Sequence, residues 1–171
     1  MTETTFLQIA QRNQDKLFRF ARRLLKDVSA AEDAVQDLLA KLWNKRHALN
    51  AYENIDVFMM VAMKNHCFDE IKKSKRRTQH YALHAVENTA KVATPERQVE
   101  GITTVALVSQ LIDELPETQR MVMQLRDIEQ LELKEIEDIL GLQPNAVRTN
   151  LSRARKKVRE KLKKIHNYGL E

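Results

Sequence analysis

The sequence predicts an all-α protein built from two small helical units that a linker joins. Apolar residues recur at intervals of three and four almost throughout, and no stretch of useful length alternates as a strand would. Strong helix formers are frequent, whereas the chain has only three glycines and three prolines. A chain of 171 residues has room for two units of roughly 70 residues each. We place the units at residues 1–77 and 104–171, with the linker at 78–103.

The first unit is predicted to contain three helices. An apolar stripe from Leu17 to Leu25 marks the first helix. Ser29 and Glu32 have the spacing of a capping box, which predicts that the second helix begins there. Residues 44–54 lose the periodicity and read as a loop. A third helix is expected from Ile55 to Arg77. The inward positions of the last two helices are Ala31, Ala34, Val35, Leu38, Leu39, Leu42 and Trp43, then Phe58, Val61, Ala62, Phe68 and Ile71.

The second unit is predicted to contain four helices. Pro116 is tolerated in the first turn of its second helix, and Pro144 starts its fourth. Gly141 stands where a left-handed cap ends the third helix. The inward positions, helix by helix, are Val105, Val108, Leu111, Ile112 and Leu115; Met121, Val122 and Leu125; Leu133, Ile136, Ile139 and Leu140; and Val147, Leu151, Ala154, Val158 and Leu162.

The charge pattern around Gly141 indicates a helix-turn-helix. The helix before this glycine is mostly acidic, and between Gly141 and Ile165 the only acid among many cations is Glu160. In such a motif the second helix enters the major groove of DNA. A cationic run on its own more often marks a solvated helix face, but the order acidic helix, glycine turn, basic helix favours DNA binding. The candidate DNA contacts are Arg148, Thr149, Asn150, Ser152, Arg153, Arg155 and Lys156.

Arg148 is the strongest candidate for a contact to a base. It lies in the early turns of the last helix, and a guanidinium can bond O6 and N7 of guanine together. A second basic cluster closes the first unit, where Asn65, Asp69, Lys72 and Arg76 share one helix face. That face is predicted to follow a DNA backbone, although cations at a helix C-terminus also offset the helix dipole. The cluster consists of Lys64, Lys72, Lys73, Lys75, Arg76 and Arg77.

Composition narrows the class of protein. The net charge of +5 favours a polyanionic partner. Cys67 is the only cysteine, so no disulfide forms within the chain, and we expect it to be a small buried residue. His80 and His84 have helical metal-ligand spacing but lack further ligands. We see no phosphate-binding loop, nucleophile motif, secretory signal or membrane-length apolar run. We therefore expect a cytoplasmic protein with no catalytic residues, metal, cofactor or small-molecule substrate.

Several segments together resemble a known family. The first unit resembles region 2 of extracytoplasmic-function (ECF) sigma factors through residues 31–37, Lys41 to Trp43, and residues 65–72. The second unit resembles region 4 of the same family. The residues that carry this second likeness are Leu115, Pro116, Arg120, Leu125, Arg126, Lys134 to Ile136, Ile139 to Gly141, Val147, Arg148 and Leu151 to Arg155. The segments occur in the family's order, and the pair of regions is more specific than either alone.

The resemblance implies an alternative sigma factor that binds bacterial core RNA polymerase and promoter DNA. The positions that would contact the polymerase are Glu32, Asp33, Gln36 and Asp37. The loop at 44–56 and the helix after it would capture an opened strand of the near promoter element, with Lys64, Asn65 and Lys72 close to it. The basic end with Lys73, Arg76 and Arg77 would lie nearby, and region 4 would read the far element. An anti-sigma factor that holds both units is also expected.

The sequence departs from the family pattern at Glu137, and one alternative function stays open. Family members commonly have alanine where Glu137 stands, so we expect this side chain to point outward or to distort the tight helix crossing. Trp43 and Phe58 have core spacing, and we expect them to pack rather than to stack on DNA. A helix-turn-helix repressor or a response-regulator output domain would explain residues 141–165 equally well. It would not explain the acidic patch and the basic helix of the first unit.

Overall fold

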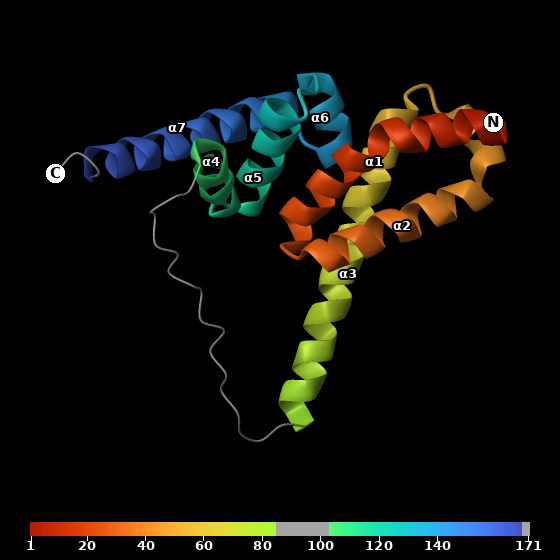
Figure 1. The fold of residues 1–171 in the computed structure, drawn as a ribbon, viewed down its shortest axis with the longest axis horizontal. Helices are drawn as coiled ribbons and strands as arrows, with labels where there is room; N and C mark the ends of the chain where they lie inside the picture. Colours follow the sequence, from red (N-terminus) through yellow and green to blue (C-terminus); the bar gives the residue numbers. More distant parts are fainter. Residues whose placement is uncertain (85–102, 169–171) are drawn as a thin grey trace.

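The structure of this chain is a computed structural model that describes residues 1–84 and 103–168. Within these ranges every regular element is a helix, which confirms the all-α prediction (Figure 1). The elements are α1 (Glu3–Leu25), α2 (Val28–Asn44), the 3₁₀ helix η1 (Arg46–Ala51), α3 (Ile55–His84), α4 (Thr104–Asp113), α5 (Glu117–Met123), the π-helix η2 (Gln124–Ile128), α6 (Leu133–Leu140) and α7 (Pro144–Tyr168).

Helix α1 is longer than its predicted apolar stripe. It begins at Glu3 because the hydroxyl of Thr2 accepts a hydrogen bond from the Thr5 amide at 3.2 Å. Phe6 and Ile9 continue the buried side towards the N-terminus. The helix packs against both α2 and α3, so these three helices share one core.

The predicted capping box at the start of α2 is wrong. The cap is Asp27, whose Oδ1 accepts a hydrogen bond from the Ala30 amide at 2.7 Å. Ser29 therefore already lies within the first turn, because a carboxylate two residues earlier satisfies the free amide. The predicted buried side of α2 is confirmed at Ala31, Ala34, Val35, Leu38 and Leu42, while Leu39 and Trp43 are partly buried.

Helix α3 departs from the prediction in three ways. The segment before it contains the helix η1 rather than only a loop, and α3 continues to His84 rather than ending at Arg77. Its most buried residues are Met59, Met60, Met63 and Cys67, whereas the five predicted inward residues are only half-buried. The reason is that α3 packs against α1 and α2 and also against α6, which broadens its apolar side. Residues 85–102, in the predicted linker, lie outside the described residues.

The second unit follows its predicted pattern closely. Val147, Leu151, Ala154 and Val158 are buried along α7. Gly141 has a φ of 66°, and its amide donates to the Glu137 carbonyl at 2.8 Å, which is the predicted left-handed cap. An observed capping box between Glu132 and Glu135 starts α6. Val105 is an exception, because its side chain is exposed rather than inward.

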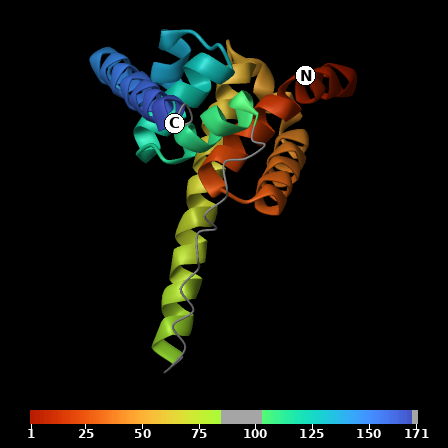
Figure 2. The ribbon, with the colours of Figure 1, turned by 60° about the vertical axis from the view of Figure 1, so that its left-hand side comes forward.

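The two units pack directly against each other. Helix α3 lies on α6, and α1 lies on α5 and η2 (Figure 1). One apolar cluster runs through the junction and includes Leu17 and Met63 from the first unit and Met121, Leu125 and Ile139 from the second. The C-terminal part of α3 extends as a rod away from the other helices (Figure 2). The predicted strand-binding residues Lys64, Asn65 and Lys72 lie on the part of α3 that faces the second unit.

Replacing Gln130 with glycine is expected to stabilise the protein. Gln130 follows the π-helix with a φ of 57°, a left-handed conformation that costs an L-residue about 1–2 kcal/mol. Part of this gain is lost because glycine makes the unfolded chain more flexible. We therefore expect the free energy of unfolding to increase by about 0.5–1 kcal/mol. Chemical denaturation measures it. The control Gln130→Ala keeps a Cβ and should give no gain; equal stability of both variants and the parent would contradict the prediction.

Candidate nucleic-acid and protein-binding surfaces

Helix α7 presents a basic surface opposite its buried side. Val147 and Val158 are buried against the rest of the second unit, and α7 packs on α4, α5 and α6. The structure brings together five of the predicted DNA contacts on the solvent side, at helical spacing. These exposed residues are Arg148, Thr149, Ser152, Arg153 and Lys156. An exposed helix of this kind, held by its apolar side, has the form of a recognition helix that can enter a major groove.

Two other predicted contacts on α7 are engaged within the protein. The Asn150 amide donates to the Ala146 carbonyl at 2.9 Å. Arg155 donates through Nε and Nη2 to both oxygens of Asp127, at 3.0 and 2.5 Å, and this hydrogen bonding raises the pKa of Arg155. The structure therefore holds Arg155 against η2. Sequence periodicity does not reveal this pair, because the two residues lie on different elements.

Glu137 does not point outward as expected. Its side chain is 12% exposed, and its carboxylate lies 3.8 Å from the Lys134 ammonium. The Glu137 carbonyl accepts hydrogen bonds from Gly141 and Leu142, so the end of α6 stays regular. The helix-turn-helix thus accommodates a carboxylate beside its turn.

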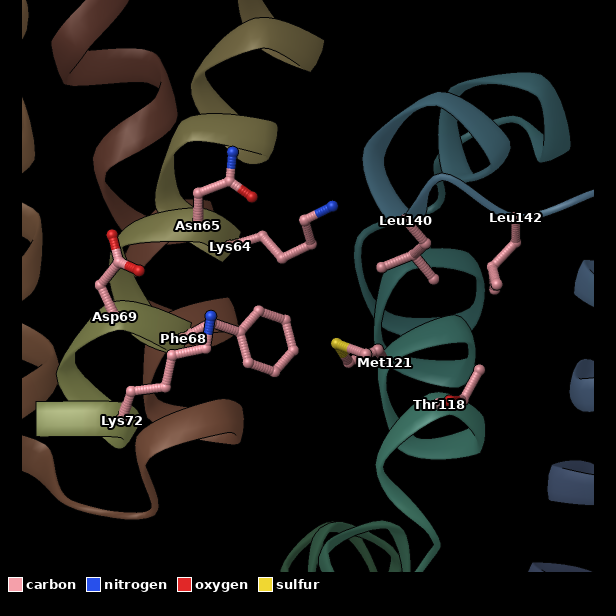
Figure 3. A pocket seen from close by; sticks show the side chains of 9 residues that line it. All are labelled: Lys64, Asn65, Phe68, Asp69, Lys72, Thr118, Met121, Leu140 and Leu142. Atoms are coloured by element: carbon pink, nitrogen blue, oxygen red, sulfur yellow. The ribbon is translucent and has the colours of Figure 1, made fainter. Parts of the chain in front are cut away.

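A cleft lies between α3 and the second unit. Its volume is about 620 Å³, and Figure 3 shows its two walls facing each other. Lys64, Asn65 and Lys72, the predicted strand-binding residues, line one wall together with Phe68 and Asp69, and Phe68 points across towards Met121. The opposite wall consists of Thr118, Met121, Leu140 and Leu142. Partial burial lowers the pKa of Lys64.

The basic end of the same helix lies outside the cleft. Lys73, Arg76 and Arg77 are exposed. The Lys73 ammonium donates to Glu70 at 2.7 Å, which raises the pKa of Lys73 and lowers that of Glu70. Glu70 therefore offsets part of the positive charge on this face of α3. Arg76 and Arg77 extend the positive face towards the C-terminus of the helix.

The acidic patch on α2 is fully presented to solvent. Glu32, Asp33, Gln36 and Asp37 are exposed, on the side of the helix opposite its buried residues. His66 lies 4.0 Å from Asp37, but burial, followed by the nearby Lys41 charge, lowers the pKa of this imidazole. Burial therefore disfavours the charged imidazole that could pair with Asp37, whose side chain is 67% exposed.

The aromatic residues of the first unit pack together. Trp43 makes an edge contact with Phe6, with ring centroids 5.5 Å apart, and the Arg46 guanidinium lies over its face. Phe58 stacks on Tyr52 at 3.8 Å. The prediction that Trp43 and Phe58 pack within the protein is confirmed. Sequence reasoning passed over Tyr52, which remains half-exposed beside the start of α3.

No group of three or more potential metal ligands comes together in the described part of the chain. The side chains of His80 and His84 lie outside the described residues. Cys67 is buried, as predicted, and burial raises the pKa of its thiol to about 12, which removes it as a nucleophile at neutral pH. None of the described helices has the length and apolar character to cross a membrane.

These surfaces define a two-part helical DNA-binding protein with a helix-turn-helix in its second part. Two family profiles match the chain in the same order. "Sigma-70 region 2" matches residues 9–77, and "Sigma-70, region 4" matches residues 106–158. The chain belongs to the ECF RNA polymerase sigma factor family, and it is an alternative sigma factor, a transcription initiation factor.

Curated relatives match nearly the whole chain. The RNA polymerase sigma-E factor of Streptomyces coelicolor is 27% identical, over 92% of this chain and 85% of its own length. The ECF RNA polymerase sigma factor SigW of Bacillus subtilis is 25% identical, over 95% and 91%. The likeness therefore spans both units and the segment between them.

Solved structures share the fold. The sigma factor RpoE of Bartonella quintana, solved with the anti-sigma factor NepR, superposes with a TM-score of 0.74 at 22% identity, covering 93% of this chain and 97% of its own. CnrH, solved with the cytosolic domain of CnrY, gives a TM-score of 0.63 at 21% identity, covering 95% and 90%. Both comparisons support the two-unit architecture.

Proposed function

We propose that this sigma factor directs core RNA polymerase to its promoters through three surfaces. The acidic patch of α2 (Glu32, Asp33, Gln36, Asp37) binds the polymerase. The α3 face with Lys64, Asn65 and Lys72 contacts an opened strand of the near promoter element. The exposed side of α7 reads the far element as duplex. The chain acts in the cytoplasm, and its units are residues 1–77 and 104–171. It needs no catalytic centre, metal or cofactor of its own.

The observation that carries this proposal is the separation of charge on the surface. The acidic side of α2 and the cationic recognition helix α7 are both exposed, and they belong to different units. One surface suits a basic protein partner, and the other suits phosphates and base edges. A repressor requires only the second surface.

In vitro transcription with purified core enzyme tests the proposal. A promoter selected from random sequence should give transcripts only when the polymerase and this chain are both present. The chain alone should bind the same duplex weakly. Tight binding of the free chain as a dimer, without any transcript, would favour the repressor instead.

The structure also supports a regulatory protein partner that contacts both units. A groove of about 670 Å³ lies between α1 and α4, with Val28, Val105 and Ile128 exposed along it. Four basic side chains border these apolar residues: Arg22 and Lys26 are exposed, whereas Arg19 and Arg23 are paired with Glu129 and Asp113. An amphipathic acidic segment of an anti-sigma factor would complement this groove in both polarity and charge.

A Val105→Glu substitution is expected to weaken such a partner and to raise transcription in its host under non-inducing conditions severalfold. The carboxylate would enter an apolar site and repel an acidic segment. A reporter fused to a promoter of the factor measures the change. The control is Leu7→Glu, since Leu7 is also apolar and exposed but lies outside the groove. An equal rise in both variants, or no rise at Val105, would count against the groove.

A further inference from the structure

Arg23 of α1 lies at the centre of the junction between the two units. Its side chain is only 12% exposed. Nη1 donates to the Asp113 carboxylate at 2.7 Å and to the Ser109 carbonyl at 3.0 Å, and Nε donates to the Gln124 side chain at 3.0 Å. All three acceptors belong to the second unit, in α4 and η2. A single guanidinium therefore joins one unit to two elements of the other.

Arg19, one turn earlier on the same side of α1, makes a second connection. Its Nε and Nη2 donate to the two oxygens of Glu129 at 2.8 and 2.7 Å. The Glu129 side chain is 1% exposed, and Gln124 also donates to it at 2.9 Å. Because Gln124 contacts Arg23 as well, the two arginines belong to one polar network. Arg19 and Arg23 can form these hydrogen bonds only while the two units are in contact.

The π-helix η2 and the residue that follows it supply two of the acceptors of this network. Gln124 begins η2 and Glu129 follows it, with the Glu129 amide bonded to the Gln124 carbonyl at 3.0 Å. This wider turn brings both side chains towards α1. A π-turn inside a short helix is uncommon and often accompanies a functional site. Here the π-turn places Gln124 and Glu129 where they accept hydrogen bonds from Arg23 and Arg19.

The closed arrangement has a consequence for the proposed strand-binding face. The cleft that contains Lys64, Asn65 and Lys72 has α5 and α6 as its other wall (Figure 3). The start of α6 is acidic, and Glu135 accepts a hydrogen bond from Asn54 at 3.3 Å, just before α3 begins. The second unit therefore stands over the face of α3 that we propose contacts the strand.

We propose that Arg19 and Arg23 form a clamp that keeps the free chain closed and competes with strand binding. The clamp holds the second unit over the strand-binding face of α3. Binding of an opened strand there requires the clamp to open, so the closed population weakens the apparent affinity for the strand in proportion. The predicted change in affinity rests on the proposed function, whereas the closed state of the free chain does not.

Small-angle X-ray scattering of the free, full-length chain tests the clamp. Arg23→Glu places a carboxylate against Asp113 and should increase the radius of gyration. Asp113→Arg attacks the same contact from the other unit and should act alike. The double variant Arg23→Glu/Asp113→Arg restores the ion pair in reverse and should return the radius towards the parent value. Circular dichroism confirms that each variant retains its helices.

The matched control is Arg12→Glu. Arg12 also lies on α1 and pairs with a carboxylate at 2.8 Å, but its partner Asp56 belongs to the first unit. This control should leave the radius of gyration unchanged. If Arg23→Glu, Asp113→Arg and Arg12→Glu all scatter like the parent, the clamp does not exist.

Binding of single-stranded DNA to the free chain is the second readout, with a random-sequence oligonucleotide as the probe. The opened variants should bind it about tenfold more tightly than the parent, since the lost charged hydrogen bonds correspond to at least that change in the opening equilibrium. Expanded variants that bind the oligonucleotide no better than the parent would overturn the competition. If neither the parent nor any variant binds it, the proposed strand contact fails, and the scattering alone then decides whether the clamp exists.

Discussion

The double substitution Asp33→Lys/Asp37→Lys is expected to abolish stable association with core RNA polymerase. Both carboxylates lie on the exposed side of α2, and the buried residues of that helix are untouched. Reversing two charges at a complementary interface replaces attraction by repulsion, and each such contact is worth several kcal/mol when desolvated. We expect at least about a hundredfold loss of affinity, measured by titrating labelled core enzyme.

Two measurements accompany this variant. The free energy of unfolding, measured by thermal denaturation, should stay within about 0.5 kcal/mol of the parent value. The reason is that exposed substitutions away from caps and the core change stability little. The control for charge reversal outside the patch is Asp138→Lys, which reverses one charge at a half-exposed residue of α6. The proposed polymerase surface would be wrong if the α2 variant bound core normally, or if the control lost affinity to the same extent.

Replacing Arg148 with alanine is expected to cost the holoenzyme about 1–3 kcal/mol at the far promoter element and to relax the sequence preference at one base pair. Arg148 is exposed near the start of α7, the part of a recognition helix that meets base edges in a major groove, and no ion pair within the described residues holds it. Selection of promoters from a randomised library, followed by sequencing, measures the preference directly.

Lys157→Ala is the matched comparison on the same helix. Lys157 is exposed but lies several turns beyond Arg148, so we expect it to contact phosphates. Its loss should weaken all promoters alike and reduce the salt dependence of binding, without changing the base preference. If both variants altered affinity uniformly, Arg148 would have no role in reading a base.

The sequence by itself determined the helices and the nature of their surfaces. Apolar residues three and four apart predicted the buried sides of α2 and α7, and Gly141 predicted the turn between α6 and α7. These features depend on neighbours within one or two turns, which a sequence displays directly. The cap of α2 was still misplaced from Asp27 to Ser29, because both residue types can cap and only the backbone distinguishes them.

Only the tertiary structure decided which side chains are free and how the units meet. Arg155 looks like a DNA contact in the sequence, yet it pairs with Asp127. Arg23 looks like an ordinary surface cation, yet it joins α1 to α4 and η2. Such pairs link residues far apart along the chain, and their formation depends on the crossing of packed helices. A local sequence pattern carries no information about how two distant helices cross. Hydrophobic periodicity therefore predicts the helices but not the closed state of this sigma factor.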